Sequence, residues 1–239
     1  MMQRIVTAEL LDGLGADDPD AVRSRMDLQR VHRAMGTRAI LLSALRALAA
    51  RLPKDRPLRV LEIGAGDGSL LLGVAQELSP RWSSVELTLL DRQHLLDQAT
   101  RDAYAAVGWH AVAQVVDVLD WAAASVPGTW DLVVANLFLH HFESVQLNVI
   151  LDAIALGSSQ FFACEPRRDW LALAGSHLIG TIGANVVTRE DAVLSVHAGF
   201  NGDEITALWP QDDGQWQVQE YSAGLFSHCF RAERLGLRQ

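Results

Sequence analysis

Short apolar runs, each ending at a glycine or a polar residue, recur through the middle of the chain. Runs of this length, rich in Val, Leu and Ile, are typical of buried β-strands. They predict strands at residues 60–63, 85–91, 111–116, 130–136 and 159–165. The first run leads directly into a glycine turn and a helix, and Pro166 ends the last one. A further helix is expected over residues 143–156.

Helical and antiparallel segments flank these strands. Residues 21–52 carry apolar side chains at helical spacing, with a possible break at Gly36. Arginines gather at the start of this segment, and we interpret them mainly as the solvated face of a packing helix. Residues 168–198 predict two helices that would form a substrate wall. Near the end, residues 216–221 and 226–233 predict antiparallel strands joined by a Ser-Ala-Gly turn.

The turn after the first strand indicates a nucleotide-type site. Gly64, Gly66 and Gly68 let the backbone turn sharply and approach a ligand, and Glu62 and Asp67 bracket the turn. In a dinucleotide fingerprint the third glycine comes one place later. Carboxylates at the turn would repel a polyphosphate, whereas they suit a ligand with an ammonium or sulfonium group. S-adenosylmethionine carries both groups.

Polar residues follow the next strands at the same predicted edge of the sheet. Asp91 comes about 20 residues after the glycines, where a carboxylate can accept from both ribose hydroxyls. Asp117 could accept from an adenine amino group, with Val118 on the ring face. The fourth strand ends at Asn136 and leads into Leu-Phe-Leu-His-His, where the transferred methyl is expected. The alternative for each acid is a helix N-cap or a turn residue.

These motifs, in this order, resemble the class I S-adenosylmethionine-dependent methyltransferases over roughly residues 58–165. The resemblance implies an α/β fold with a Rossmann-like, seven-stranded, mostly parallel sheet, helices on both faces and a closing antiparallel strand. It also implies a single domain over residues 1–239. That domain would comprise an N-terminal helical cap (1–55), a cofactor-binding core (56–165), and a substrate wall with closing strands (166–239). In similar proteins such a cap often closes the pocket.

The same resemblance implies which residues would hold the cofactor. By analogy, the glycine turn would contact the methionine part, Asp91 the ribose and Asp117 the adenine. The expected contact residues are Glu62, Gly64, Ala65, Gly66, Asp91, Arg92, Asp117, Val118 and Asn136.

Methyl transfer requires in-line approach of a nucleophile, and an alcohol or phenol must also lose a proton. His140 and His141 directly follow the fourth strand, and histidine is the natural base near neutral pH. Paired histidines serve as base candidates in some similar small-molecule O-methyltransferases. We therefore expect His140 or His141 to act on the acceptor, with Glu165 orienting His140. The alternative is that one histidine packs or caps the next helix.

The acceptor is expected to be a small organic molecule. The turn after Asn136 lacks the Pro-Pro-aromatic pattern of enzymes that methylate amino groups in nucleic acids. No convincing set of oxygen ligands for magnesium can be assembled, so no metal is expected. The C-terminal part carries Ala-Cys-Glu-Pro-Arg-Arg at 163–168, Ser-Val-His-Ala-Gly-Phe at 195–200 and Phe-Ser-His-Cys-Phe-Arg-Ala at 226–232. With these motifs it resembles bacterial methyltransferases of phenolic polyketide or quinone pathways. This favours O-methylation of a phenolic, quinone or polyketide-like acceptor, with C-methylation of a similar molecule as the alternative.

Bulk composition agrees with one cytoplasmic domain. The 239 residues are 49% hydrophobic and 21% charged, ordinary values for a globular protein. A net charge of −9 argues against a nucleic-acid partner. No apolar stretch reaches the length of a membrane span and no leader pattern is present, so no membrane partner is expected. Cys164 and Cys229 have no ligand-like spacing and are expected to be buried. The oligomeric state stays open.

Two other classes of function remain from the sequence. One is a nicotinamide-dependent oxidoreductase, which the glycine spacing disfavours. The other is a protein that binds the cofactor or a partner without catalysis, because the cofactor motifs would look the same in it.

Overall fold

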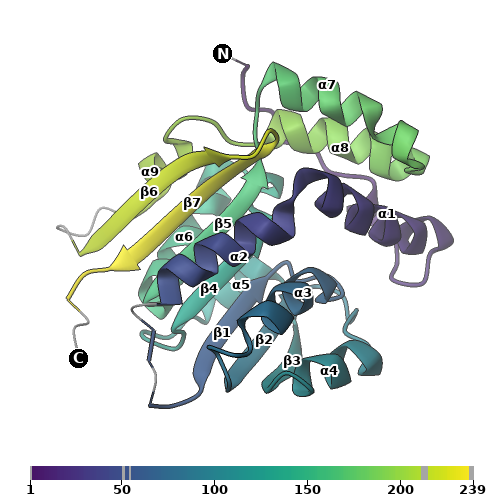
Figure 1. Ribbon diagram of the computed structural model, residues 1–239. Coiled ribbons are helices and arrows are strands. Elements are labelled where there is room, and N and C mark those ends of the chain that lie inside the picture. Colours follow the sequence, from purple (N-terminus) through teal and green to yellow (C-terminus); the bar gives the residue numbers. More distant parts are fainter. Residues whose placement is uncertain (1, 50–51, 54, 211–214, 237–239) are drawn as a thin grey trace.

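A seven-stranded sheet forms the centre of the computed structural model, which describes residues 2–49, 52–53, 55–210 and 215–236. Within these residues the strand order is β3-β2-β1-β4-β5-β7-β6 (Figure 1). Neighbouring strands from β3 to β5 are parallel, and β7 pairs antiparallel with both β5 and β6. The strands are β1 Leu58–Ile63, β2 Val85–Asp91, β3 Trp109–Val115, β4 Leu132–Asn136, β5 Gln160–Pro166, β6 Trp216–Ala223 and β7 Ser227–Arg234. The predicted fold class is confirmed.

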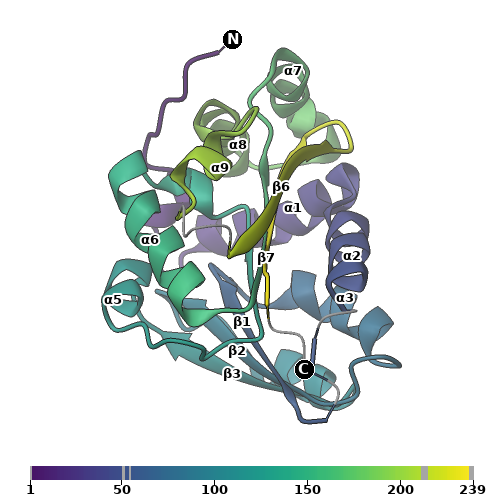
Figure 2. The same ribbon diagram turned by 90° about the vertical axis from the view of Figure 1, so that its left-hand side faces the viewer.

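Helices cover both faces of the sheet (Figure 2). The α-helices are α1 Pro19–Met35, α2 Thr37–Leu48, α3 Ser69–Leu78, α4 Gln98–Ala105, α5 Val118–Ala123, α6 Ser144–Gly157, α7 Trp170–Leu178, α8 Val186–Ala198 and α9 Glu204–Leu208. The 3-10 helices are η1 Leu11–Gly13, η3 Leu139–His141 and η4 Ile179–Ile182. Among the described residues, none of these helices combines the length and apolar character needed to cross a membrane.

Two apolar cores lie on opposite faces because successive side chains of a strand point to opposite sides. On β1, Val60 packs in the core beneath α2, α3 and α4, whereas Leu61 and Ile63 pack in the core beneath α5, α6 and α9. Cys164 and Cys229 face each other across β5 and β7 as buried, free thiols. Because the five strands β1 to β5 are parallel, their carboxyl ends lie at one edge of the sheet, where the polar residues of the site follow them.

Of the two N-terminal helices, α1 lies at that edge, whereas α2 packs with α3 and β5 on one face of the sheet. Gly36 separates α1 from α2 at the predicted break, with a φ of 69° that suits glycine. Helix α1 packs with α8, which packs with α7, and the three lie together at one end of the sheet (Figure 1). The segment before α1 crosses the same end, where Ile5 N donates to His197 O at 3.1 Å and Arg4 Nη2 donates to Phe142 O at 2.8 Å.

Candidate cofactor and acceptor site

A cavity of about 670 Å³ lies at the carboxyl ends of β1, β2 and β4. Open parallel sheets bind ligands in this place. The residues of the predicted cofactor set all line it: Glu62, Gly64, Ala65, Gly66, Asp91, Arg92, Asp117, Val118 and Asn136. His140 and His141 line it as well, while Glu165 is fully buried behind them. The structure therefore brings the predicted residues together around one space.

The glycine turn closes tightly on one side and leaves room on the other. Gly64 has a φ of 68°, and a Cβ there would lie 2.1 Å from Cδ2 of Phe138. Its N–H donates to Leu90 O at 2.9 Å, which ties the turn to β2. Gly66 has a φ of 56°, but a Cβ there would meet nothing within 4 Å. The turn thus needs glycine for its backbone at both positions and presents open space at Gly66.

Two acceptor oxygens in this cavity lack a hydrogen-bond partner in the part of the chain that the structure describes. Glu62 is 3% exposed and Asn136 is 8% exposed, yet Glu62 Oε2 and Asn136 Oδ1 accept no hydrogen bond from any described residue. Burial, and then the charges of Asp67 and Asp91, raise the pKa of Glu62 to about 8. Buried acceptors are normally paired, so these oxygens await a donor. A ligand ammonium group would satisfy both, and the residues present fit S-adenosylmethionine.

Asp91 links the glycine turn to the end of β2. Its Oδ2 accepts from Gly66 N at 2.9 Å and its Oδ1 accepts from Gln93 N at 2.9 Å. Each carboxylate oxygen keeps capacity for a further donor such as a ribose hydroxyl. At the rim of the cavity, half-exposed Arg92 pairs with Asp12 at 3.0 Å.

Asp117 has the local role that was the alternative to cofactor binding. It is the N-cap of α5, and its Oδ1 accepts from Leu119 N at 2.8 Å. Its neighbour Val118 is 4% exposed. Because both residues line the cavity, the cap leaves an adenine contact possible through the remaining lone pairs.

Glu165 organises the turn that carries the two histidines. Its Oε1 accepts from Phe138 N at 3.1 Å and from Leu139 N at 3.0 Å. Its Oε2 lies 2.8 Å from Nδ1 of His140. One buried carboxylate therefore holds both the backbone of the turn and the His140 ring, which is the predicted pairing of these residues.

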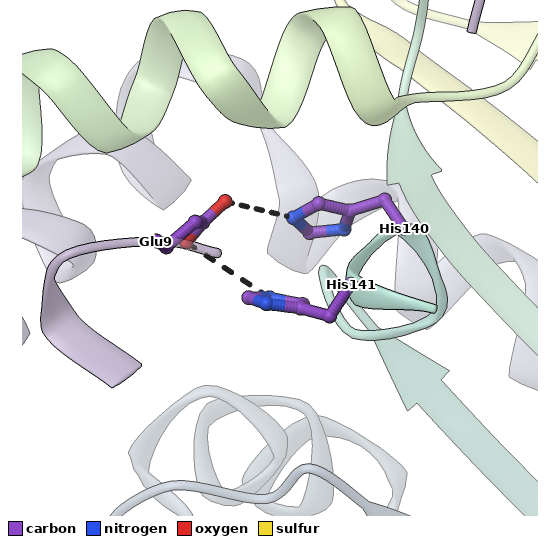
Figure 3. A group of neighbouring side chains, drawn as sticks. All are labelled: Glu9, His140 and His141. Carbon is purple, nitrogen blue, oxygen red and sulfur yellow. Dashed lines mark hydrogen bonds and ion pairs between the residues drawn. The ribbon is translucent and has the colours of Figure 1, made fainter. Parts of the chain in front are cut away.

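Two acids from the N-terminal segment complete this cluster, and sequence reasoning missed both. Glu9 Oε1 lies 3.3 Å from His140 Nε2, and Glu9 Oε2 lies 3.9 Å from His141 Nε2 (Figure 3). Asp12 Oδ2 lies 3.0 Å from His141 Nδ1. Burial would lower the pKa of His140, but its contacts with Glu165 and Glu9 outweigh burial and raise it to about 9.

A second cavity adjoins the first and is strongly apolar. It has a volume of about 320 Å³ and is formed by side chains of α1, α7 and α8, together with Phe226. The two cavities share Glu9, Leu137 and Ser195, so they meet beside the histidine cluster. Leu137 has a φ of 48°, a strained value for a residue with a side chain, and such strain often marks functional positions.

Several large aromatic side chains from the second half of the chain serve the cores. Phe161, Phe162, Phe200 and Trp209 are at most 2% exposed in the cores, whereas Trp170 is 74% exposed. Core packing accounts for the four buried rings. The predicted wall from residues 168–198 does line the apolar cavity, through aliphatic and small side chains of α7 and α8.

The strand order, the glycine turn and the cavity at the strand ends define an α/β fold of the methyltransferase type. Solved structures with this fold include the plantazolicin methyltransferase BpumL in complex with SAH, at 14% identity over 91% of each chain and a TM-score of 0.60. They also include the plantazolicin methyltransferase BamL in complex with a triazolic desmethylPZN analog and SAH, at 13% identity over 93% of this chain and 92% of that one, with a TM-score of 0.62.

An O-methyltransferase family protein from Burkholderia thailandensis is similar at 16% identity, with a TM-score of 0.59. The match covers 91% of this chain and 60% of that one. No protein-family model matches the sequence, and no curated protein matches it either. At these identities the likeness shows the fold alone, which this chain shares with these methyltransferases.

Proposed function

We propose that this protein transfers a methyl group from S-adenosylmethionine to an oxygen atom of a small organic acceptor. The observation that carries the proposal is the pair of buried, unpartnered oxygens of Glu62 and Asn136 beside an open glycine turn. A cationic amino group is the partner that such a pair favours. The plantazolicin methyltransferases of the same fold hold SAH, which supports the choice of cofactor.

The cofactor residues would divide their work by position in the cavity. Glu62 and Asn136 would hold the ammonium group, and Gly66 would let the backbone approach the ligand. Asp91 would accept from the ribose hydroxyls. The adenine would lie at Asp117, with Val118 on its face, and the rim residue Arg92 would border it. S-adenosylmethionine supplies, when bound, a methyl group activated on a sulfonium sulfur.

The acceptor hydroxyl would lie where the two cavities meet. Glu9, His140 and His141 stand there. Because the pKa of His140 is raised to about 9, Glu9 and His141 are the candidates to remove the proton near neutral pH, and His140 would do so only at higher pH. Glu165 would act as a positioning residue, because it holds the turn and the His140 ring. Strand ends and buried hydrogen bonds make this arrangement rigid, and methyl transfer depends strongly on alignment.

The apolar cavity favours an acceptor with a polar end and a hydrocarbon-rich body. Its volume lies at the lower end of the roughly 300–1,000 Å³ of small-molecule sites. An elongated phenol with an alkyl or polyketide-derived tail would place its hydroxyl at Glu9 and its tail against Val31, Met35 and Val196. C-methylation of the same ring would use the same cavities and differs only in the attacking atom.

The proposal is tested with a panel of alkylphenols of increasing chain length and purified S-adenosylmethionine. Products are followed by mass spectrometry, and SAH binding is measured separately by calorimetry. We expect a mono-methylated ether whose rate of formation rises with tail length and then falls when the tail exceeds the cavity. Tight SAH binding with no methylated product in the panel or in cell extract would favour a non-catalytic role. Binding of a nicotinamide dinucleotide in place of SAH would overturn the proposal.

A further inference from the structure

Glu9, His140 and His141 converge on one point of the site (Figure 3). The Nε2 atoms of the two histidines point at different oxygens of the same carboxylate, and one ligand atom from each residue lies within 4.8 Å of the others. Donor atoms about 2.1 Å from a tetrahedral ion are roughly 3.4 Å apart. The histidine Nε2 atoms lie 3.3 Å and 3.9 Å from different oxygens of Glu9, and one ligand atom from each of the three residues lies within 4.8 Å of the others, so side-chain shifts would close the three groups on one ion.

The other ring nitrogen of each histidine is held by a carboxylate of its own. His140 Nδ1 lies 2.8 Å from Glu165 and His141 Nδ1 lies 3.0 Å from Asp12. When Nδ1 of a neutral imidazole donates to a carboxylate, the free lone pair is on Nε2, which in both histidines faces Glu9. This carboxylate–histidine arrangement is the usual support of a metal-binding imidazole. A site with a single histidine base needs one carboxylate to orient that histidine, whereas here Glu165 orients His140 and Asp12 orients His141.

The charge around the cluster also favours a cation. Glu9, Asp12 and Glu165 bring three carboxylates to two imidazoles, and Glu9 is largely buried. Of the nearby guanidinium groups, that of Arg92 contacts Asp12, while that of Arg4 donates to backbone carbonyls. A divalent ion between Glu9 and the histidines would offset this excess of negative charge.

We propose that Glu9, His140 and His141 bind a divalent transition-metal ion of the zinc type. Two imidazoles and one carboxylate suit zinc, and three protein ligands leave a coordination position open, as in catalytic zinc sites. This revises the expectation of no metal, which weighed oxygen ligands for magnesium and the spacing of the two cysteines. Metal binding itself does not depend on the proposed function. If that function holds, the open position would take the acceptor oxygen and favour loss of its proton to solvent.

Zinc content and cobalt absorption test the site in the full-length protein with any affinity tag removed. After treatment with a chelator and dialysis against zinc, we expect one ion per chain in the wild type. His141→Ala and Glu9→Gln should each lose it, whereas His110→Ala, which removes an exposed imidazole from β3, should retain it. Asp12→Asn should weaken zinc binding by about 10- to 100-fold, the usual effect of losing an outer partner.

Cobalt provides the spectroscopic readout. Wild-type protein loaded with cobalt should show the intense visible bands of a low-coordinate site, and the two ligand variants should not. Thermal midpoint and SAH affinity confirm that each variant is folded, and Glu9→Gln keeps the shape of the side chain. Equal zinc content and equal cobalt spectra in wild type, His141→Ala and Glu9→Gln would overturn the proposal.

The outcomes separate this inference from the proposed function. Methyl transfer that persists unchanged in metal-free protein would refute a metal at the acceptor while leaving the transferase assignment intact. Stoichiometric zinc with no methyl transfer to any acceptor would refute the transferase assignment while leaving the metal site intact. Loss of SAH binding would count against the proposed function alone, because the cofactor groups of Glu62 and Asp91 are separate from the metal ligands.

Discussion

Replacing Glu62 by glutamine is expected to stabilise the empty protein while weakening cofactor binding. Burial, and then the charges of Asp67 and Asp91, raise the pKa of Glu62 from 4.5 to about 8. Because the folded-state pKa lies above the unfolded one, the stability contributed by the protonated carboxyl is complete below pH 4.5 and is lost as the pH rises to 8. Burial, and then the charges of Glu62 and Asp67, raise the pKa of Tyr104, so its hydroxyl stays neutral in this window.

The size of the effect follows from the pKa difference. Each pH unit inside this window costs the wild type about 1.4 kcal/mol, so from pH 4.5 to pH 7 the loss is about 3 kcal/mol. The Glu62→Gln protein has no titrating carboxyl at this position, so its free energy of unfolding does not fall with pH for this reason. It also cannot supply the negative charge for an ammonium group, so SAH should bind about 10- to 100-fold more weakly, as expected for one charged hydrogen bond.

Urea unfolding of both proteins between pH 5 and pH 8, without ligand, measures the first effect. The free-energy difference between Glu62→Gln and wild type should grow steadily with pH. Calorimetry with SAH measures the second effect. A difference for Glu62→Gln that does not change with pH, or an unchanged SAH affinity, would refute the assignment of Glu62 as the buried acid awaiting a cation.

Three further replacements probe the turn, the acceptor cavity and the histidines. Gly64→Ala should destabilise the protein by about 1–3 kcal/mol and abolish SAH binding, because it combines a φ of 68° with a side-chain carbon 2.1 Å from the new Cβ. Gly15→Ala, with open space around it and outside both cavities, serves as the control in the same unfolding and binding assays, and equal stability of the two variants would contradict this account. Ala192→Phe should fill the apolar cavity and raise KM for long-tailed acceptors by about tenfold with SAH affinity unchanged; an unchanged KM would place the tail elsewhere. Replacing His140 and His141 together by glutamine should lower turnover by about 10²- to 10⁴-fold and leave SAH binding intact, whereas unchanged turnover in the labelled-methyl assay would remove both from the chemistry.

Local pattern was enough to predict much of the fold. The second strand was expected over residues 85–91 and is found there, because its apolar run is bounded on both sides. The break at Gly36 and the pairing of β6 with β7 were equally visible. By contrast, the short helices α4 and α9 were not predicted. The sequence of α4, Gln98–Ala105, is largely polar and its one buried side chain is Tyr104, so it lacks the repeated apolar positions that indicate a helix.

The cofactor side of the site could be read from the sequence, but the acceptor side could be read only in part. Strand-end residues such as Asp91 follow their strands directly, so their place at the edge follows from the topology. Glu9 and Asp12 lie in a segment without periodic pattern. Contacts distant in sequence hold this segment in place, among them the hydrogen bond from Ser195 to Glu9 and the bond from Leu11 N to Asp191 at 3.0 Å. No local signal marks such residues.

The central claim is methyl transfer from S-adenosylmethionine to a small acceptor, and one measurement addresses it directly. The protein is incubated with methyl-labelled S-adenosylmethionine and fractionated cell extract, and the label is followed into solvent-soluble, nucleic-acid and protein fractions. Label in a small, organic-soluble product, lost in the His140 and His141 double variant, is the predicted result. Label confined to nucleic acid or protein, or tight SAH binding with label in none of the fractions, would contradict it.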